Sequence, residues 1–191
     1  MPAKNTPSRY GWLSIALHWG MALTVIGMFA LGIWMRELSY YDPWYKDAPA
    51  IHKSIGILLF LMLIVRIVWR NINIRPTDDP ALKPWERTTA HLTHIALYGL
   101  MLALMIAGYL ISTADGRAIE VFGWFQVPAT LYDLPEQEDI AGEIHELIAW
   151  ALILLAGVHA LAALKHHFIN RDTTLLKMLG RDAKSPTDHA N

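Results

Sequence analysis

Histidine is the residue type in this chain that is best suited to binding a metal. Two of its nine histidines, His145 and His159, lie fourteen residues apart in one apolar stretch over residues 139–170. Fourteen residues of α-helix rise about 21 Å and return to within about 40° of the starting direction, so both imidazoles face one side of a helix at two depths. An imidazole inside a membrane helix needs a partner for its ring nitrogens. Iron is one such partner, and a packing hydrogen bond is the simpler alternative for a single histidine.

The stretch that carries these residues is one of four apolar stretches, each long enough to cross a bilayer as a helix. Of the 191 residues, 54% are hydrophobic and 17% are charged, and the mean hydropathy is +0.28, which is typical of a membrane protein. We expect an all-α membrane protein, a four-transmembrane-helix bundle over residues 10–170, with an N-terminal segment (1–9) and a polar, poorly ordered tail (171–191). The predicted spans are about 10–35, 50–70, 88–111 and 141–169.

Composition excludes several kinds of partner and cofactor. The formal net charge is −1, so no basic excess exists to neutralise phosphates, and we expect no nucleic acid partner. The chain has no cysteine, which excludes disulfides, thiolate-ligated iron–sulfur clusters and thioether-linked haem. Any haem must therefore be held non-covalently.

The distribution of positive charge predicts the orientation of the spans. Twelve of the 16 Lys and Arg residues fall at the end of the bundle that holds both termini, and four fall at the other end. Cytoplasmic segments carry the excess of Lys and Arg in membrane proteins. Both termini are therefore predicted to be cytoplasmic.

Four histidines pair by depth once the spans are oriented. His52 and His145 lie about three and six residues from the periplasmic ends of the second and fourth spans. His18 and His159 each lie about nine residues from the cytoplasmic ends of the first and fourth spans. A six-coordinate haem needs two axial ligands on opposite sides of its ring, and facing helices of a bundle supply them. The depths therefore predict one haem-iron site at His52 and His145 and another at His18 and His159.

Other uses of membrane histidines fit less well. Zinc or copper prefers three or four ligands that converge on one point, whereas His18 lies far along the membrane normal from His52. Proton relays usually include acidic residues inside the spans, and the span centres here hold none. Glu143 and Glu146 flank His145 near the surface, where they are either solvated or orient the imidazole.

The remaining histidines have less defined roles. His91 and His94 lie in the first turns of the third span, where the depth argument gives them no haem partner. An interfacial structural role and contact with a quinone headgroup or a haem propionate both stay open. His166 and His167 are expected in the cytoplasmic headgroup layer, although His166 faces roughly the same side as His159 and is its rival as a ligand.

The longest loop, residues 112–140, is rich in acidic residues and contains the aromatic run Phe122, Gly123, Trp124 and Phe125. Aromatic side chains favour the headgroup layer, so the run is expected to rest on the membrane surface. A lid over the edge of a cofactor and a docking surface for a partner are the alternatives.

Motifs in all four spans resemble the bacterial cytochrome b561 family. They are ALHW in the first span, IHKSIGILLF in the second, AHLTHIALYGLM in the third, and IHELIAWALILLAGVHALAALKHHF followed by NRDTTLLKMLGR in the last. The family comprises four-helix inner-membrane proteins that bind two b-type haems. The resemblance implies that His52 and His145 hold the periplasmic haem and that His18 and His159 hold the cytoplasmic haem.

Three functions follow as hypotheses. The first is a di-haem protein that transfers electrons between a periplasmic donor and ubiquinone or menaquinone in the membrane. The family resemblance implies superoxide as one candidate donor. The second is a cytochrome b anchor subunit of a periplasmic dehydrogenase or hydrogenase. The third is a haem-free membrane carrier or scaffold. Haem propionates have candidate partners at both ends, namely Arg66 and Arg70 on the cytoplasmic side and Arg36 and Lys53 on the periplasmic side.

Overall fold

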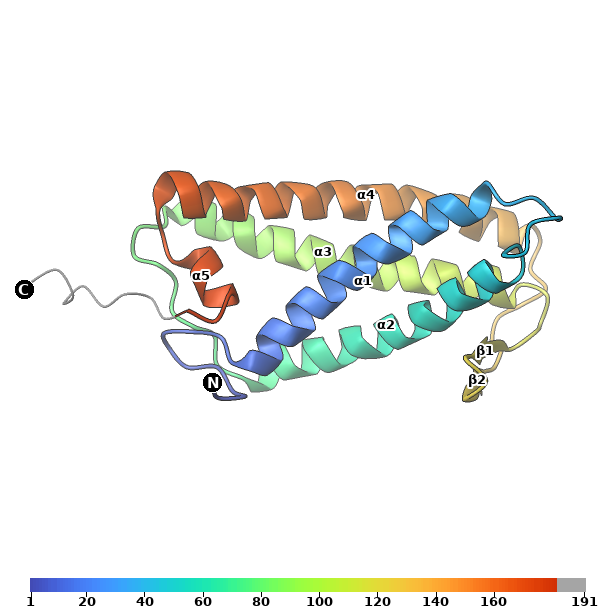
Figure 1. Ribbon diagram of the computed structural model, residues 1–191, viewed down its shortest axis with the longest axis horizontal. Helices are drawn as coiled ribbons and strands as arrows, with labels where there is room; N and C mark the ends of the chain where they lie inside the picture. Colours follow the sequence, from blue (N-terminus) through green and yellow to red (C-terminus); the bar gives the residue numbers. More distant parts are fainter. Residues whose placement is uncertain (182–191) are drawn as a thin grey trace, which may run out of the picture.

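The computed structural model describes residues 1–181 and consists mainly of four long helices (Figure 1). All four are long and apolar enough to cross a membrane, which confirms the predicted class of fold. Between them lie a two-stranded hairpin and, after the last span, a π-helical turn and a short helix. The elements in chain order are α1 (Trp12–Arg36), α2 (Asp47–Ile72), α3 (Pro84–Thr113), β1 (Ile119–Val121), β2 (Phe125–Val127), α4 (Gln137–Lys165), η1 (His166–Asn170) and α5 (Thr174–Met178).

The bundle has two distinct ends, which we call the terminal face and the hairpin face. The terminal face holds residues 1–11 and 171–181, and the hairpin face holds β1 and β2 (Figure 1). Helix α3 packs along α4, and α1 packs along α2. Figure 1 shows α1 crossing the bundle obliquely, from beside α2 at the terminal face to beside α4 towards the hairpin face. The rings of Phe29 on α1 and Trp150 on α4 meet edge to face at 4.9 Å.

A small apolar core lies at mid-height in the bundle. Its buried residues come from every span, and many other large apolar side chains point outward, as expected where lipid replaces water. Because the core lies between the levels of His52 and His18, it separates the two ends of the bundle. The core residues are Met21, Leu59, Leu63, Met101 and Leu152.

The loop after α3 contains a β-hairpin that the sequence did not predict. Residues Ile119–Val121 pair antiparallel with Phe125–Val127, and the tight turn between them has positive φ at Phe122 and Gly123. Ser54 on α2 fastens the hairpin, since its hydroxyl donates to Glu120 O and accepts from Phe122 N. Three-residue strands are too short to give an alternating pattern in the sequence.

The segment after the last span is folded as far as residue 181, whereas the sequence predicted a poorly ordered tail from residue 171. Trp19 donates to Met178 O, and Lys177 Nζ donates to Thr77 O at 2.7 Å. Asp79 accepts hydrogen bonds from both the amide and the hydroxyl of Thr173. These contacts attach α5 to α1 and to the connection before α3, which local sequence patterns cannot reveal. Residues 182–191 of the predicted tail lie outside the described residues.

The contact between Asp79 and Thr173 gives a testable prediction for the attachment of α5. Hydrogen bonds to a charged group contribute about 1.5–3 kcal/mol, so Asp79→Asn should speed hydrogen–deuterium exchange at the amides of residues 173–178. Burial raises the pKa of Asp79, but hydrogen bonds from Ala81 and Thr173 outweigh it and the pKa is lowered. The attachment should therefore be complete above the ordinary pKa of aspartate and weaken as the pH falls through the lowered value.

Asp78→Asn is the matched control, because Asp78 forms an exposed ion pair with Arg87 and is not bonded to α5 in the described residues. Equal rates of hydrogen–deuterium exchange at residues 173–178 in both variants would contradict the role of Asp79 in attaching α5.

Candidate functional site

The hairpin-face pair of histidines is brought together as the sequence predicted. His52 on α2 and His145 on α4 are half-buried, with ring centres 6.3 Å apart and ring planes at 67°. His145 Nδ1 lies 2.9 Å from Leu104 O, a contact in which Nδ1–H donates and Nε2 stays available. His52 Nδ1 is buried and has no hydrogen-bond partner among residues 1–181. This pair therefore presents imidazole nitrogens that the surrounding protein leaves free.

Glycines leave room beside both of these rings. A Cβ at Gly108 on α3 would lie 3.0 Å from His145 Cε1, closer than such contacts normally occur, and one at Gly32 on α1 would lie 3.5 Å from His52 Cε1. Both glycines and both histidines line a cleft of about 1410 Å³. Binding pockets for drug-sized ligands measure about 300–1,000 Å³, so this cleft has room for a larger, flat ligand.

The terminal-face site holds three histidines instead of the predicted two. His18 on α1 and His159 on α4 have ring centres 6.4 Å apart, with planes at 73°. His94 on α3 lies closer to His159, at 5.1 Å. The depth argument left His94 without a partner because it started the third span near residue 88. The helix begins at Pro84, so His94 lies ten residues into α3 and at the level of His18.

Arg66 on α2 contacts this cluster directly. Its Nη2 donates to His18 Nδ1 at 3.0 Å and its Nε donates to the Tyr98 hydroxyl at 2.8 Å. The Arg70 guanidinium lies over the ring of Tyr98, 5.5 Å from its centre. The terminal-face site therefore has a local positive charge.

The separations within the two predicted pairs suit axial ligation of a haem iron. An imidazole nitrogen binds a metal at about 2 Å and the ring centre lies about 1 Å behind it, so two imidazoles on opposite sides of one iron have ring centres about 6 Å apart. The pairs His52/His145 and His18/His159 match this value at 6.3 and 6.4 Å, whereas His94 and His159 at 5.1 Å are too close. Paired neutral imidazoles are also an established donor set for haem.

Sites for other metals are not formed in the described part of the chain. Residues 1–181 contain no group of three or more His, Cys, Asp or Glu side chains that could hold a metal ion. His166, the expected rival of His159, is engaged elsewhere, because its Nδ1 lies 2.6 Å from a buried carboxylate oxygen of Asp172. His91 is exposed on α3.

The charged residues near the hairpin-face pair lie largely where the sequence placed them. Glu146 is half-exposed and forms an ion pair with Arg36, so its carboxylate is solvated and pairs with Arg36 rather than with His145. Arg36 and Lys53 both line the cleft, where the sequence placed them as candidate partners for propionates. Glu143 is exposed.

Sequence reasoning missed several residues that shape the two sites. Gly108, Gly32 and the Leu104 carbonyl depend on how the helices pack, for which one sequence gives no signal. A signal for His94 was present: Pro84 at the first helical position and Glu86 two residues later are typical of a helix start. Placing that start correctly brings His94 to the level of His18.

Comparisons with known proteins show which proteins the chain is similar to. The family model for prokaryotic cytochrome b561 matches residues 9–181. The chain is 54% identical over 183 residues to "Cytochrome b561 homolog 2" of Escherichia coli (strain K12), covering 96% of the chain and 97% of that relative. It is 32% identical over 173 residues to "Probable superoxide oxidase CybB" of Yersinia pestis, covering 90% and 96%. It is 31% identical over 180 residues to "Cytochrome b561 homolog 1" of E. coli, covering 91% and 98%.

The close approach of Gly108 to His145 predicts a selective defect. Gly108→Ala should displace the His145 ring and weaken haem binding at the hairpin face, since overpacking costs about 1–3 kcal/mol. The haem content of the purified variant, measured from its absorption spectrum, should fall towards half that of the parent. Gly99→Ala on the same helix is the control, because an added Cβ there meets nothing within 4 Å. An unchanged Gly108→Ala spectrum, or an equal loss in both variants, would contradict this geometry.

Proposed function

Because the chain belongs to the prokaryotic cytochrome b561 family, we propose that it binds two b-type haems and passes electrons between a periplasmic donor and the membrane quinone pool. It is a multi-pass membrane electron-transfer protein of the bacterial inner membrane, and membership of a cytochrome b family implies haem b. The proposal adds the number of haems, their ligands and the two reaction partners.

The observation that carries the proposal is that α4 contributes one histidine to each of two pairs at opposite ends of the bundle. His145 faces His52, and His159 faces His18, both at the separation that axial ligation requires. When bound, haem b supplies a one-electron couple between ferric and ferrous iron. With His52 and His145 on one iron and His18 and His159 on the other, no coordination position would remain for oxygen or substrate, so each haem would exchange electrons without forming bonds at the metal.

The protein around the histidines orients them and excludes water. The Leu104 carbonyl fixes the His145 ring and its tautomer, and Gly108 and Gly32 leave space beside the two hairpin-face rings. The buried core of Met21, Leu63 and Met101 fills the space between the two levels. An electron that moves between the sites therefore crosses the apolar centre of the bundle without meeting solvent.

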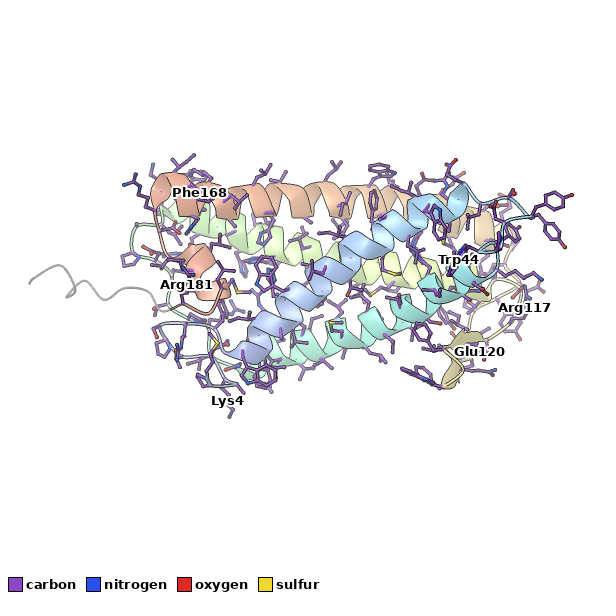
Figure 2. All side chains as sticks on the ribbon, viewed as in Figure 1. Lys4, Trp44, Arg117, Glu120, Phe168 and Arg181 are labelled. Atoms are coloured by element: carbon purple, nitrogen blue, oxygen red, sulfur yellow. The ribbon has the colours of Figure 1, made fainter. Side chains whose placement is uncertain are left out.

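The proposed orientation places the terminal face in the cytoplasm and the hairpin face in the periplasm. Figure 2 shows Lys4 and Arg181 at the terminal face and Trp44, Arg117 and Glu120 at the opposite end. The excess of Lys and Arg at the terminal face supports this orientation. The His18/His159 site is then cytoplasmic and the His52/His145 site is periplasmic.

Quinone is the proposed acceptor at the cytoplasmic side, and a small diffusible donor is proposed at the periplasmic side. His91, His94 and Tyr98 follow one another along α3, where His94 lies 5.1 Å from His159, and their polar groups suit a quinone headgroup. The relative named "Probable superoxide oxidase CybB" supports superoxide as the donor. Lys53 in the hairpin-face cleft favours an anion, whereas Arg36 is paired with Glu146 and the acidic loop over residues 112–140 opposes an anion.

A second candidate function is that of an anchor subunit for a periplasmic dehydrogenase or hydrogenase. The hairpin favours it, because Trp124 is 74% exposed and Phe122 is 44% exposed at its tip. Exposed aromatic side chains are enriched where proteins dock. In this case electrons would arrive from a bound subunit instead of a diffusible donor.

The proposed ligands predict the haem content of defined variants. The pure protein should show reduced-minus-oxidised b-type bands with two haems per chain, and His145→Ala and His159→Ala should each retain one. His94→Ala should retain both, because its ring is too close to His159 to share an iron. A colourless protein would exclude electron transfer through haem and leave the carrier or scaffold alternative. Loss of a haem in His94→Ala would mean that the terminal-face ligands are misassigned.

Proteoliposomes test the route of the electrons and separate the two candidate functions. The route can be driven in reverse with the protein purified alone and inserted in one orientation, where ubiquinol or menaquinol in the membrane should reduce the haems. The electrons should then pass to ferricyanide, which cannot cross the bilayer, on the hairpin side. His145→Ala should lose the transfer to ferricyanide while quinol still reduces its remaining haem, and Glu143→Gln, an exposed neighbour, should behave as the parent. Electron exchange at the hairpin side only when a copurifying subunit is present would favour the anchor function.

A further inference from the structure

The two histidine pairs lie in opposite electrostatic environments. At the terminal face, the Arg66 guanidinium contacts both His18 and Tyr98, and Arg70 lies over the Tyr98 ring. Neither arginine forms an ion pair with a carboxylate in the described part of the chain. The protein therefore leaves positive charge uncompensated beside His18.

At the hairpin face, by contrast, the charges beside the histidines largely cancel. Arg36 pairs with Glu146, and Arg117 pairs with Asp115. Both pairs are exposed, so solvent screens what remains of their fields. The charged residues that line this cleft are Arg36, Lys53 and Arg117 together with Glu37, Asp115, Glu138 and Glu146.

Hydrogen bonding to the ligands adds to this contrast. His145 donates its Nδ1–H to the Leu104 carbonyl, which makes the imidazole a stronger electron donor to a metal. A stronger donor stabilises ferric iron over ferrous iron. At His18 the group next to Nδ1 is the Arg66 guanidinium, which cannot accept a hydrogen bond and so cannot strengthen this imidazole as a donor.

Arg66 also has hydrogen-bonding capacity left for a bound group. Its Nη1 is buried and has no partner among residues 1–181. The contact of Nη2 with His18 requires Nδ1 to be the acceptor, which leaves the imidazole proton on Nε2. Ligation of iron through Nε2 and this hydrogen bond therefore exclude each other. With His18 bound to iron, both Nη1 and Nη2 of Arg66 are able to donate to an anionic group such as a propionate, while Nε stays on Tyr98.

From these contacts we propose that Arg66 gives the terminal-face haem the higher reduction potential of the two, and so directs electrons from the hairpin face to the terminal face. The inference rests on the proposed di-haem function. Reduction lowers the charge of the haem iron by one, so a fixed positive charge beside it stabilises the reduced form. Each transfer moves one electron from ferrous iron at the hairpin face to ferric iron at the terminal face, and no bond is made or broken. Quinone, the acceptor already proposed, takes up two such electrons with two protons.

Redox titration of the purified holoprotein, followed at its b-type bands, tests the inference. The titration should resolve two one-electron steps. In Arg66→Gln the reduction potential of the upper step should fall by at least about 59 mV, which corresponds to a tenfold change in the reduction equilibrium for one electron. The lower step should stay in place. Arg66→Lys, which keeps the charge, should retain most of the upper potential.

Arg87→Gln provides the matched control, since Arg87 lies on the same face but forms an exposed ion pair with Asp78. It should titrate as the parent does. Single-haem variants assign the steps: the haem kept by His145→Ala should titrate at a higher potential than the haem kept by His159→Ala. This order tests the inference even where Arg66→Gln binds haem poorly.

Failure of the inference and failure of the proposed function give different results. A parent protein with fewer than two haems contradicts the proposed function. Two haems with the reverse order of potentials, or a shift of the lower step alone in Arg66→Gln, overturn only the role of Arg66. An unchanged upper step in an Arg66→Gln protein that holds both haems overturns it as well.

Discussion

The fold depends on one constraint: imidazole rings inside a membrane bundle must have partners for their nitrogens, and a single helix carries two of them. On α4, His145 and His159 face the inside of the bundle at two levels, so other helices must bring a partner to each level. Helix α2 does so at the hairpin face and α1 at the terminal face. The oblique course of α1 places it beside α2 at one end and beside α4 at the other (Figure 1). The apolar core at mid-height keeps the levels apart.

Much of this arrangement follows from the sequence, because membrane helices impose strict rules. The length of each apolar run fixes the spans, and residue spacing on a rigid helix fixes the depth of each histidine, so both pairs can be predicted from the sequence. The helices extend a few residues beyond the predicted spans, since polar residues continue a helix after the apolar run ends. That extension shifted the predicted depth of His94, which lies beside His159.

Other features depend on contacts between distant segments and were not predictable. The hairpin is held by Ser54, 66 residues away along the chain from Glu120. The segment before residue 181 is ordered by contacts with Asp79, Thr77 and Trp19, although its composition alone indicated a loose tail. The hydrogen bond from Arg66 to His18 joins α2 to α1, and anchoring at the membrane surface explained Arg66 equally well from the sequence.

The two sites have the same ligand type but different surroundings. One pair borders a large cleft with balanced charges and glycines beside its rings, whereas the other has a third histidine and an arginine without a carboxylate partner in the described chain. Both lie in one bundle of a member of the prokaryotic cytochrome b561 family. The asymmetry suits a protein that takes electrons at one surface and delivers them within or across the membrane. The Trp19 contact with Met178 also places α5 close to the terminal-face pair.

The central claim is that each histidine pair binds one iron from both sides. Low-temperature electron paramagnetic resonance of the oxidised, purified protein tests it most directly, because iron with two imidazole ligands is low-spin, whereas iron with one is high-spin. The account predicts two low-spin ferric signals and the loss of one of them in His52→Ala. A high-spin signal from the intact protein, or a single low-spin species, would contradict it.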